Sequence, residues 1–206
     1  MSKRLLGMAA LMLVIWTGGA FADTSLQDPS PLISKTAGNI FSKINAQRDA
    51  IRENPEIAES IVRDDLLPMM DIQYSARLIL GREARKASPE QLDAFARAMN
   101  DQLISRYASG LLEFRSKEQV EVMDFKGEIN PRATRVKTRF RLDSGGYALV
   151  DYVFRMTDEG WKVFDVVVEG ISYIVSFQSQ IKQEVRAIGL DAVIDRITSG
   201  ELDLAN

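Results

Sequence analysis

The segment Arg135-Val-Lys-Thr-Arg-Phe-Arg-Leu-Asp-Ser-Gly-Gly-Tyr-Ala-Leu-Val-Asp-Tyr-Val-Phe154 decides the fold class of this 206-residue chain. In its first half, basic side chains alternate with apolar or small ones, and this period of two predicts a half-buried strand. Ser144-Gly145-Gly146 then predicts a hairpin turn, and the run from Tyr147 to Met156 predicts a second strand. The segment therefore indicates an antiparallel sheet.

The same pattern continues on both sides of this hairpin. Val120 and Val122 alternate with charged residues, which predicts an earlier strand. Asp158-Glu159-Gly160 predicts a turn into a further strand from Trp161 to Val168, which Gly170 ends. The sequence thus predicts a twisted antiparallel sheet of four to five strands in meander order.

Helical periodicity replaces the period of two before and after the predicted sheet. Ser88-Pro89-Glu90-Gln91 has the form of a capping box, and an apolar stripe follows it to about residue 115. The other expected helices cover about 31–53, 55–67, 69–80, 172–188 and 190–198. Helices that flank a continuous run of strands are typical of an α+β fold, with N-terminal and C-terminal helices around the sheet.

The first 22 residues have the layout of a secretory signal peptide. Lys3 and Arg4 precede an apolar run from Leu5 to Ile15, and Ala20-Phe21-Ala22 is an A-x-A cleavage site. The apolar run is shorter than the roughly 20 residues that span a bilayer. We therefore expect a soluble, exported protein in which residues 23–206 form one domain.

Composition removes several classes of chemistry. The chain contains neither Cys nor His, which excludes disulfides, the usual His/Cys zinc sites, thiol catalysis and Ser-His-Asp triads. Without Lys3 and Arg4 the formal charge changes from −3 to −5, and this mildly acidic balance argues against a nucleic-acid partner. We expect neither a metal nor a cofactor.

Three carboxylates offer an alternative site. Asp64, Asp65 and Asp71 flank the apolar segment 66–70, and paired carboxylates can perform acid/base catalysis. Any acidic chain offers such pairs, and helix-start or solvated-face roles explain these residues as well. A small hydrolase that uses carboxylates alone is therefore one of the alternative functions.

The densest basic stretch lies on the outer side of one predicted strand. It consists of Arg132, Arg135, Lys137, Arg139 and Arg141. A solvated face explains it, and so does a docking site for an acidic partner or for anionic lipid headgroups.

Three longer stretches occur in an order that is found in a known family. They are Asp65-Leu-Leu-Pro-Met-Met-Asp71, Leu80-Gly-Arg-Glu-Ala-Arg-Lys-Ala-Ser-Pro-Glu-Gln-Leu-Asp-Ala-Phe95 and Trp161-Lys-Val-Phe-Asp-Val-Val-Val-Glu-Gly-Ile-Ser172, the last being the most specific. With them the chain resembles, from about Ser34 to Leu204, the periplasmic phospholipid-shuttle proteins of the Mla pathway (MlaC), also called toluene-tolerance proteins of the Ttg2 type.

The resemblance implies an apolar cavity between sheet and helices that holds acyl chains while the headgroup stays near solvent. It also implies a location in the Gram-negative periplasm and no bond chemistry. The cargo would be phospholipid, shuttled between an inner-membrane ABC-transporter complex with an MCE-domain component and an outer-membrane lipoprotein-porin complex, so that outer-membrane lipid asymmetry is maintained.

Facing apolar stripes, combined with the design that the resemblance implies, give twelve candidates for the cavity lining. They are Ile72, Leu78, Met99, Leu103, Tyr107, Val150, Tyr152, Phe154, Val166, Val168, Tyr173 and Phe177. Ordinary core packing explains the same periodicity. The alternative function from another class is a periplasmic chaperone that binds apolar segments of client proteins.

Overall fold

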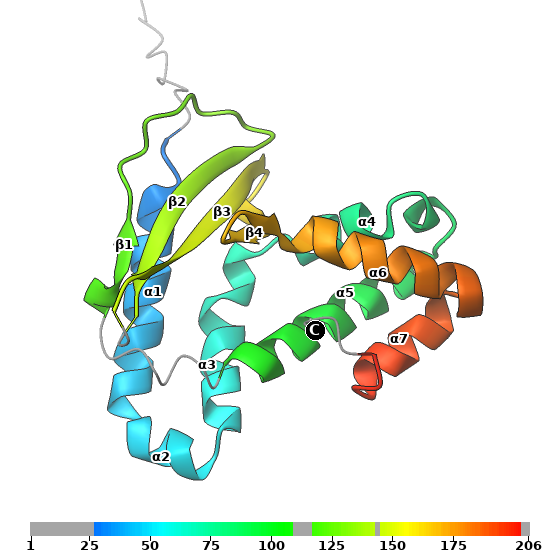
Figure 1. The fold of residues 1–206 in the computed structure, drawn as a ribbon, viewed down its shortest axis with the longest axis horizontal. Helices are drawn as coiled ribbons and strands as arrows, with labels where there is room; N and C mark the ends of the chain where they lie inside the picture. The colour runs from blue at the N-terminus through cyan, green and yellow to red at the C-terminus, as the bar shows by residue number, and fades with distance from the viewer. Residues whose placement is uncertain (1–26, 109–116, 143–144, 203–206) are drawn as a thin grey trace, which may run out of the picture.

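The computed structural model describes residues 27–108, 117–142 and 145–202. Figure 1 shows an antiparallel sheet with one group of helices behind and below it and a second group to its side. The first group is α1 (Ser30–Ala46), α2 (Arg48–Glu53) and α3 (Glu56–Asp65), and the second is α4 (Ile72–Leu80), α5 (Pro89–Tyr107), α6 (Tyr173–Ile188) and α7 (Leu190–Thr198). The α+β fold predicted from the sequence is confirmed.

The sheet has five strands, which meets the upper end of the prediction. In spatial order they are β1 (Val120–Val122), β2 (Thr134–Arg141), β3 (Tyr147–Thr157), β4 (Gly160–Val168) and β5 (Ile171–Ser172), each antiparallel to the next. The two-residue β5 has too few residues to show a period, so the sequence revealed only its turn. That turn holds Glu169 and Gly170 in the left-handed region, at φ 49° and 83°.

The strand register sorts the sheet residues onto two faces. Arg135, Lys137 and Arg139 point outward, as their alternation predicted, and Leu149, Asp151 and Val153 lie opposite them on β3. The inner face, which meets the helices, carries Thr134, Val136 and Thr138 of β2, Val150, Tyr152 and Phe154 of β3, and Val163, Val166 and Val168 of β4. Five of the twelve candidates therefore share the inner face.

A β-bulge interrupts the pairing of β3 with β4. Val153 pairs with Asp165, whereas Phe154 pairs with Val163, so Phe164 has no opposite residue on β3. The backbone beside the bulge binds the segment before α4, because the amide of Asp71 donates to the carbonyl of Val163 at 2.7 Å. The bulge thus fixes where the second helix group meets the sheet.

Three apolar clusters hold the elements together, and α5 contributes to two of them. One cluster joins the four helices α4, α5, α6 and α7 around Phe95 and Ile181, which are fully buried. A second joins α1, α2 and α3 to Ile104 near the end of α5. The third packs α1 and the short 3-10 turn Leu67–Met69 against the sheet. Consequently α5 connects the two helix groups that Figure 1 shows.

The helix boundaries differ from the prediction in two places. The helix expected over 69–80 begins only at Ile72, because residues 67–69 form a 3-10 turn and the chain is extended after it. The expected helix over 31–53 is wrong as a single element, because Gln47 leaves the helical conformation at φ −123° and ψ 18°. The turn lets both Ile44 and Ile51 reach full burial in one cluster, a tertiary effect that periodicity does not reveal. The capping box at Ser88 is confirmed, with both of its reciprocal bonds formed.

Some expectations fall outside the described residues. These are the signal peptide at 1–22, the end of the long helix near residue 115 and the Ser144 part of the hairpin turn. Within the described ranges, no helix combines the length and the apolar character that a membrane span requires.

Candidate functional site

Two adjoining apolar cavities lie between the inner face of the sheet and the helices. The smaller, of about 80 Å³, is bounded by α4, α5, α6 and the bulge on β4. The larger, of about 260 Å³, is bounded by α3, the segment 66–70, α5, β3 and β4. Five residues line both: Met70, Asn100, Leu103, Val166 and Tyr173. We call the two cavities together the chamber.

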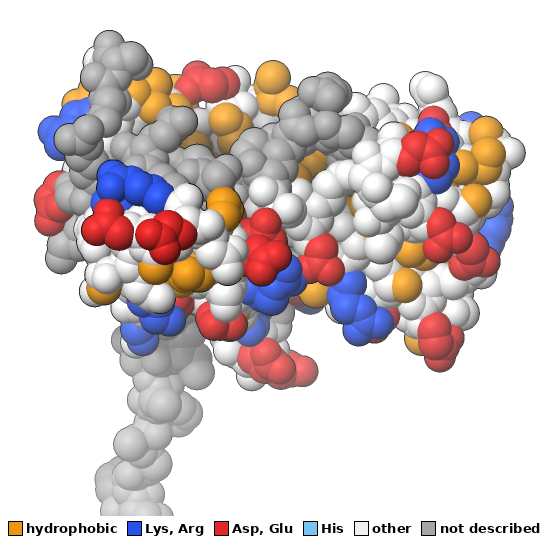
Figure 2. Space-filling view, turned by 90° about the horizontal axis from the view of Figure 1, so that it is seen from below, with side chains coloured by type: hydrophobic (Ala, Val, Ile, Leu, Met, Phe, Trp, Pro, Cys, Tyr) orange, Lys and Arg blue, Asp and Glu red, His pale blue; other side chains and the backbone are white. Residues whose placement is uncertain are grey.

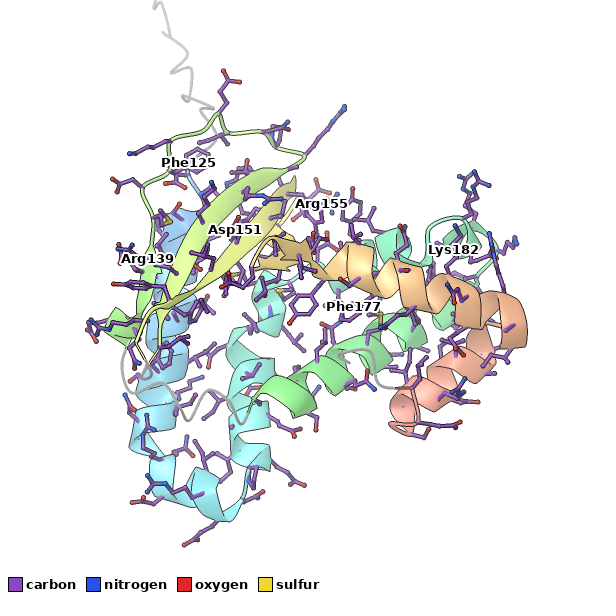
Figure 3. All side chains as sticks on the ribbon, in the orientation of Figure 1. Phe125, Arg139, Asp151, Arg155, Phe177 and Lys182 are labelled. Atoms are coloured by element: carbon purple, nitrogen blue, oxygen red, sulfur yellow. The ribbon has the colours of Figure 1, made fainter. Side chains whose placement is uncertain are left out.

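Seven of the twelve predicted residues line the chamber. Ile72, Met99 and Phe177 line the smaller cavity, Tyr152 lines the larger one, and Leu103, Val166 and Tyr173 line both. Phe177 lies between α6 and α5 (Figure 3), and its ring stacks on that of Tyr173 with centroids 5.4 Å apart. The structure thus brings together side chains from α4, α5, α6, β3 and β4.

Four other predicted residues lie away from these two cavities. Phe154 is fully buried, because α1 and Met69 fill the space over that end of the inner face. Val150 and Val168 pair with each other at the opposite end of the same face. Leu78 is half-buried on α4, where its carbonyl accepts a hydrogen bond from Gln178. The side chain of the twelfth, Tyr107, lies outside what the structure describes.

Several other residues line the chamber although the sequence did not predict them there. Leu66, Leu67 and Met70 line the larger cavity, and their unbroken apolar run before α4 was the available signal. For Asn100 the available signal was its position, because this polar residue interrupts the apolar stripe of the long helix. Phe164 reaches the smaller cavity only because of the bulge, which the sequence did not reveal.

Few polar groups line the chamber. Burial raises the pKa of Tyr152 to about 12, so its hydroxyl stays protonated at any physiological pH. The amide of Asn100 donates to the carbonyl of Ala96 at 2.7 Å. The carboxylate of Asp165 accepts from the hydroxyl of Ser172 at 2.7 Å and from the amide of Ile174 at 3.2 Å, at the start of α6.

A polar and aromatic cluster lies beside the smaller cavity, where α4 meets the sheet. The hydroxyl of Ser75 donates to the carbonyl of Phe164 at 2.6 Å. The ring of Tyr74 meets that of Phe164 edge to face, with centroids 5.3 Å apart. The guanidinium of Arg155 lies 4.3 Å from the centroid of Tyr74 and forms an ion pair with Asp71. These contacts hold one wall of the smaller cavity in place.

The three carboxylates considered for catalysis do not share a site. Asp65 pairs with Lys43 at 2.6 Å, Asp71 caps α4 and pairs with Arg155, and Asp64 is exposed. None of them lines either cavity of the chamber. Within the described part of the chain, no group of three or more His, Cys, Asp or Glu side chains is arranged to hold a metal ion.

Ion pairs occupy much of the basic outer face of β2. Arg139 binds Glu121 through two nitrogens at 2.7 and 2.8 Å, and this raises the pKa of Arg139 above its ordinary value. Arg135 pairs with Asp151 at 3.3 Å. Figure 3 labels Arg139 and Asp151 on the sheet. Docking of a partner to this face stays a prediction.

The surface elsewhere is mixed in charge. A groove of about 910 Å³ between α3, α5 and α7 is larger than the chamber, but the ion pair of Arg63 with Asp101 lines it. Figure 2 shows the lower side of the molecule, where described side chains of both signs are interspersed. We therefore regard the smaller but apolar chamber as the candidate binding site.

Comparisons with known proteins agree with one another. The sequence model of the family described as MlaC protein matches residues 34–199. The chain is 29% identical over 189 residues to the "Intermembrane phospholipid transport system binding protein MlaC" of Haemophilus influenzae, which covers 88% of this chain and 84% of that protein. It is 25% identical over 187 residues to "Toluene tolerance protein ttg2D" of Pseudomonas putida, covering 89% and 86% of the two chains.

A solved structure has the same fold. It is a phospholipid-binding protein from Ralstonia solanacearum, in complex with a phospholipid. The TM-score is 0.76 at 19% sequence identity, and the match covers 87% of this chain and 100% of that one.

Proposed function

The chain belongs to the MlaC protein family, and from this premise we propose that it is a phospholipid-binding carrier that moves phospholipid between membranes and performs no bond chemistry. One relative is named as the binding protein of an intermembrane phospholipid transport system, and a protein of the same fold was solved with a phospholipid bound. Both observations support a lipid cargo for this chain.

The chamber is the observation that carries the proposal. Eight of the eleven residues that line its larger cavity are aliphatic or methionine. Each CH₂ group removed from water contributes about 0.8 kcal/mol, so two long acyl chains represent on the order of 20 kcal/mol. A lipid therefore crosses an aqueous space only inside an apolar enclosure, and the adaptable side chains of Met70 and Met99 suit a flexible chain.

Several polar residues of the three stretches shared with the family form structural contacts, which supports carriage over catalysis. Trp161 donates its indole N–H to the carbonyl of Gln27 at 2.8 Å, and Lys162 donates to the carbonyl of Pro68 at 2.7 Å. Glu169 accepts from the amide of Leu149 at 2.7 Å. Asp65, Asp71, Asp165 and Ser172 are likewise bound to neighbouring protein groups.

The proposal also covers the location of the protein and its partner complexes. The signal-peptide pattern of residues 1–22 supports export to the periplasm. We propose that the carrier exchanges lipid with an inner-membrane MCE-domain and ABC-transporter complex and with an outer-membrane lipoprotein-porin complex, and so maintains outer-membrane lipid asymmetry. Phospholipid is its cargo, and the proposal requires no cofactor.

Native mass spectrometry of the mature protein purified from a bacterial periplasm tests the proposal. We expect about one diacyl phospholipid per chain. Leu103→Trp places a bulky side chain where the two cavities meet, so it should lower the bound lipid. The matched control Leu149→Trp lies on the outer face, where Leu149 is 48% exposed, and should keep its lipid.

An empty wild-type protein that also refuses added lipid would contradict the proposal. If that protein suppressed the aggregation of unfolded clients, the chaperone alternative would replace it.

A further inference from the structure

The hydroxyl of Tyr152 sits in an apolar environment without a hydrogen-bond partner among the described residues. Tyr152 points from the inner face of β3 into the larger cavity. Burial alone raises its pKa, with no contribution from a hydrogen bond or a neighbouring charge. Tyr152 is half-buried, and its hydroxyl faces a cavity whose other walls are mostly apolar, so a partner for this hydroxyl has to come from a molecule that enters the cavity. A bound molecule that accepts a hydrogen bond at this position would give the Tyr152 hydroxyl the partner that it lacks.

The charges around the chamber restrict what that acceptor can be. Among the described residues that line the two cavities there is no Lys or Arg, and the one carboxylate, Asp165, lines the smaller cavity. A phosphate group would find no counter-ion among the lining residues of either cavity. A neutral acceptor such as a carbonyl oxygen fits a tyrosine hydroxyl without any charge to compensate.

Asn100 supplies a second polar group on the opposite wall. It lines both cavities from α5, and its amide nitrogen bonds the carbonyl of Ala96 at 2.7 Å. An amide nitrogen has two N–H groups, so one donor is left for a ligand. Tyr152 on the sheet and Asn100 on the helix thus offer two neutral donors to the larger cavity, whose remaining lining is almost wholly apolar.

We infer that Tyr152, assisted by Asn100, binds the ester carbonyls that join the acyl chains to glycerol, and so positions the lipid and selects ester-linked over ether-linked phospholipid. The inference rests on the proposed lipid-carrier function and assigns it a specificity-determining residue. It places the ester region beside the junction of the two cavities, with the acyl chains in the apolar space and the charged headgroup outside it.

A competition between two lipids tests this role. The full mature protein, freed of lipid, is given an equimolar mixture of a diester and a diether phosphatidylethanolamine with the same chain length, and native mass spectrometry counts both complexes. An ether has no carbonyl, so we expect the wild type to favour the diester by about tenfold, with the Tyr152 hydroxyl responsible for about fivefold. Tyr152→Phe removes only the hydroxyl oxygen and should lower the preference for the diester from about tenfold to about twofold.

Tyr147→Phe is the matched control, because Tyr147 is 49% exposed and lies on the outer face beneath Arg139. It should leave the preference unchanged. Equal binding of both lipids by the wild type, or an unchanged preference in Tyr152→Phe, would overturn the inference and leave the carrier function standing. A wild type that binds neither lipid would instead overturn the carrier function itself.

Discussion

Asp71 and Arg155 are 84 residues apart in the sequence and form an ion pair where α4 meets the sheet. Asp71 also caps α4, because its carboxylate accepts from the amide of Tyr74 at 3.0 Å. Arg155 in turn covers the ring of Tyr74, which meets Phe164 in the wall of the smaller cavity. One carboxylate therefore starts a helix, pairs a half-buried cation and supports the chamber.

Two substitutions at Asp71 should separate these roles. Asp71→Asn keeps a side-chain acceptor for the helix cap but loses the charge, and we expect it to lower the free energy of unfolding by about 1 kcal/mol. Asp71→Ala loses both and should cost about 2 kcal/mol. Urea unfolding of both variants measures the difference. Equal losses would show that the cap contributes nothing.

Two predicted lining residues should respond differently to substitution. Phe154 is fully buried in a packed cluster, so Phe154→Ala should cost about 3 to 5 kcal/mol through the void it leaves. Leu103 borders empty space on two sides, so Leu103→Trp should change stability by less than about 1.5 kcal/mol while it lowers the lipid load. Chemical denaturation gives the first quantity and native mass spectrometry the second. A fully loaded Leu103→Trp protein would contradict the chamber assignment.

The raised pKa of Tyr152 predicts a loss of stability at high pH. An unfolded tyrosine titrates near pH 10, whereas Tyr152 titrates at about 12 in the fold. Between these values the folded state keeps a proton that the unfolded state has released, so the free energy of unfolding falls as the pH rises. The fall attributable to Tyr152 is about 2 to 3 kcal/mol.

Lipid-free wild type and Tyr152→Phe, unfolded in urea at a series of pH values, measure this effect. The difference between their stabilities should be constant below pH 10 and should then decrease toward pH 12. Parallel profiles across the whole range would mean that the hydroxyl is not desolvated.

Two glycines with open space around them should respond to alanine in opposite directions. An added Cβ meets no atom within 4 Å at Gly38 or at Gly170. Gly38 lies in the helix α1, so Gly38→Ala should raise the free energy of unfolding by about 0.5 to 1 kcal/mol. Gly170 has φ 83°, so Gly170→Ala should lower it by about 1 to 2 kcal/mol. Thermal unfolding checks both, and a destabilised Gly38→Ala would contradict the argument from propensity.

Local signals in the sequence predicted most of the fold. The alternation from Arg135 to Arg141 placed the basic residues outward, and the box at Ser88 placed the start of α5. Both signals depend on neighbours within a few positions. The break at Gln47 and the bulge at Phe164 depend instead on contacts with distant elements, and neither carries a Gly or Pro that would have marked it.

The sequence predicted only part of the candidate site, because the rest depends on contacts between distant elements. Periodicity correctly placed Tyr152 and Phe154 on one face of the sheet, but it does not tell which end of that face the helices fill. Only the packing of α1 and Met69 over Phe154, and the absence of such filling beside Tyr152, separates core from cavity. Asn100 could have been predicted from the sequence, because a polar residue within an apolar stripe indicates a position that is not packed into the core. It lines both cavities.

The shortness of the outer strands has a consequence for the empty carrier. β1 has three residues and β5 has two, and β5 passes directly into α6, whereas the long strands lie between them. Exposed strand edges are templates on which other chains add, and the hazard grows when apolar surface is uncovered. A carrier that releases its lipid exposes such surface repeatedly. β1 pairs with three residues of β2 and β5 with two of β4, so the rest of these edges needs other cover. At β4 the segment before α4 supplies part of it, since Met70 bridges Val163, and this leaves another copy of the carrier less strand to join.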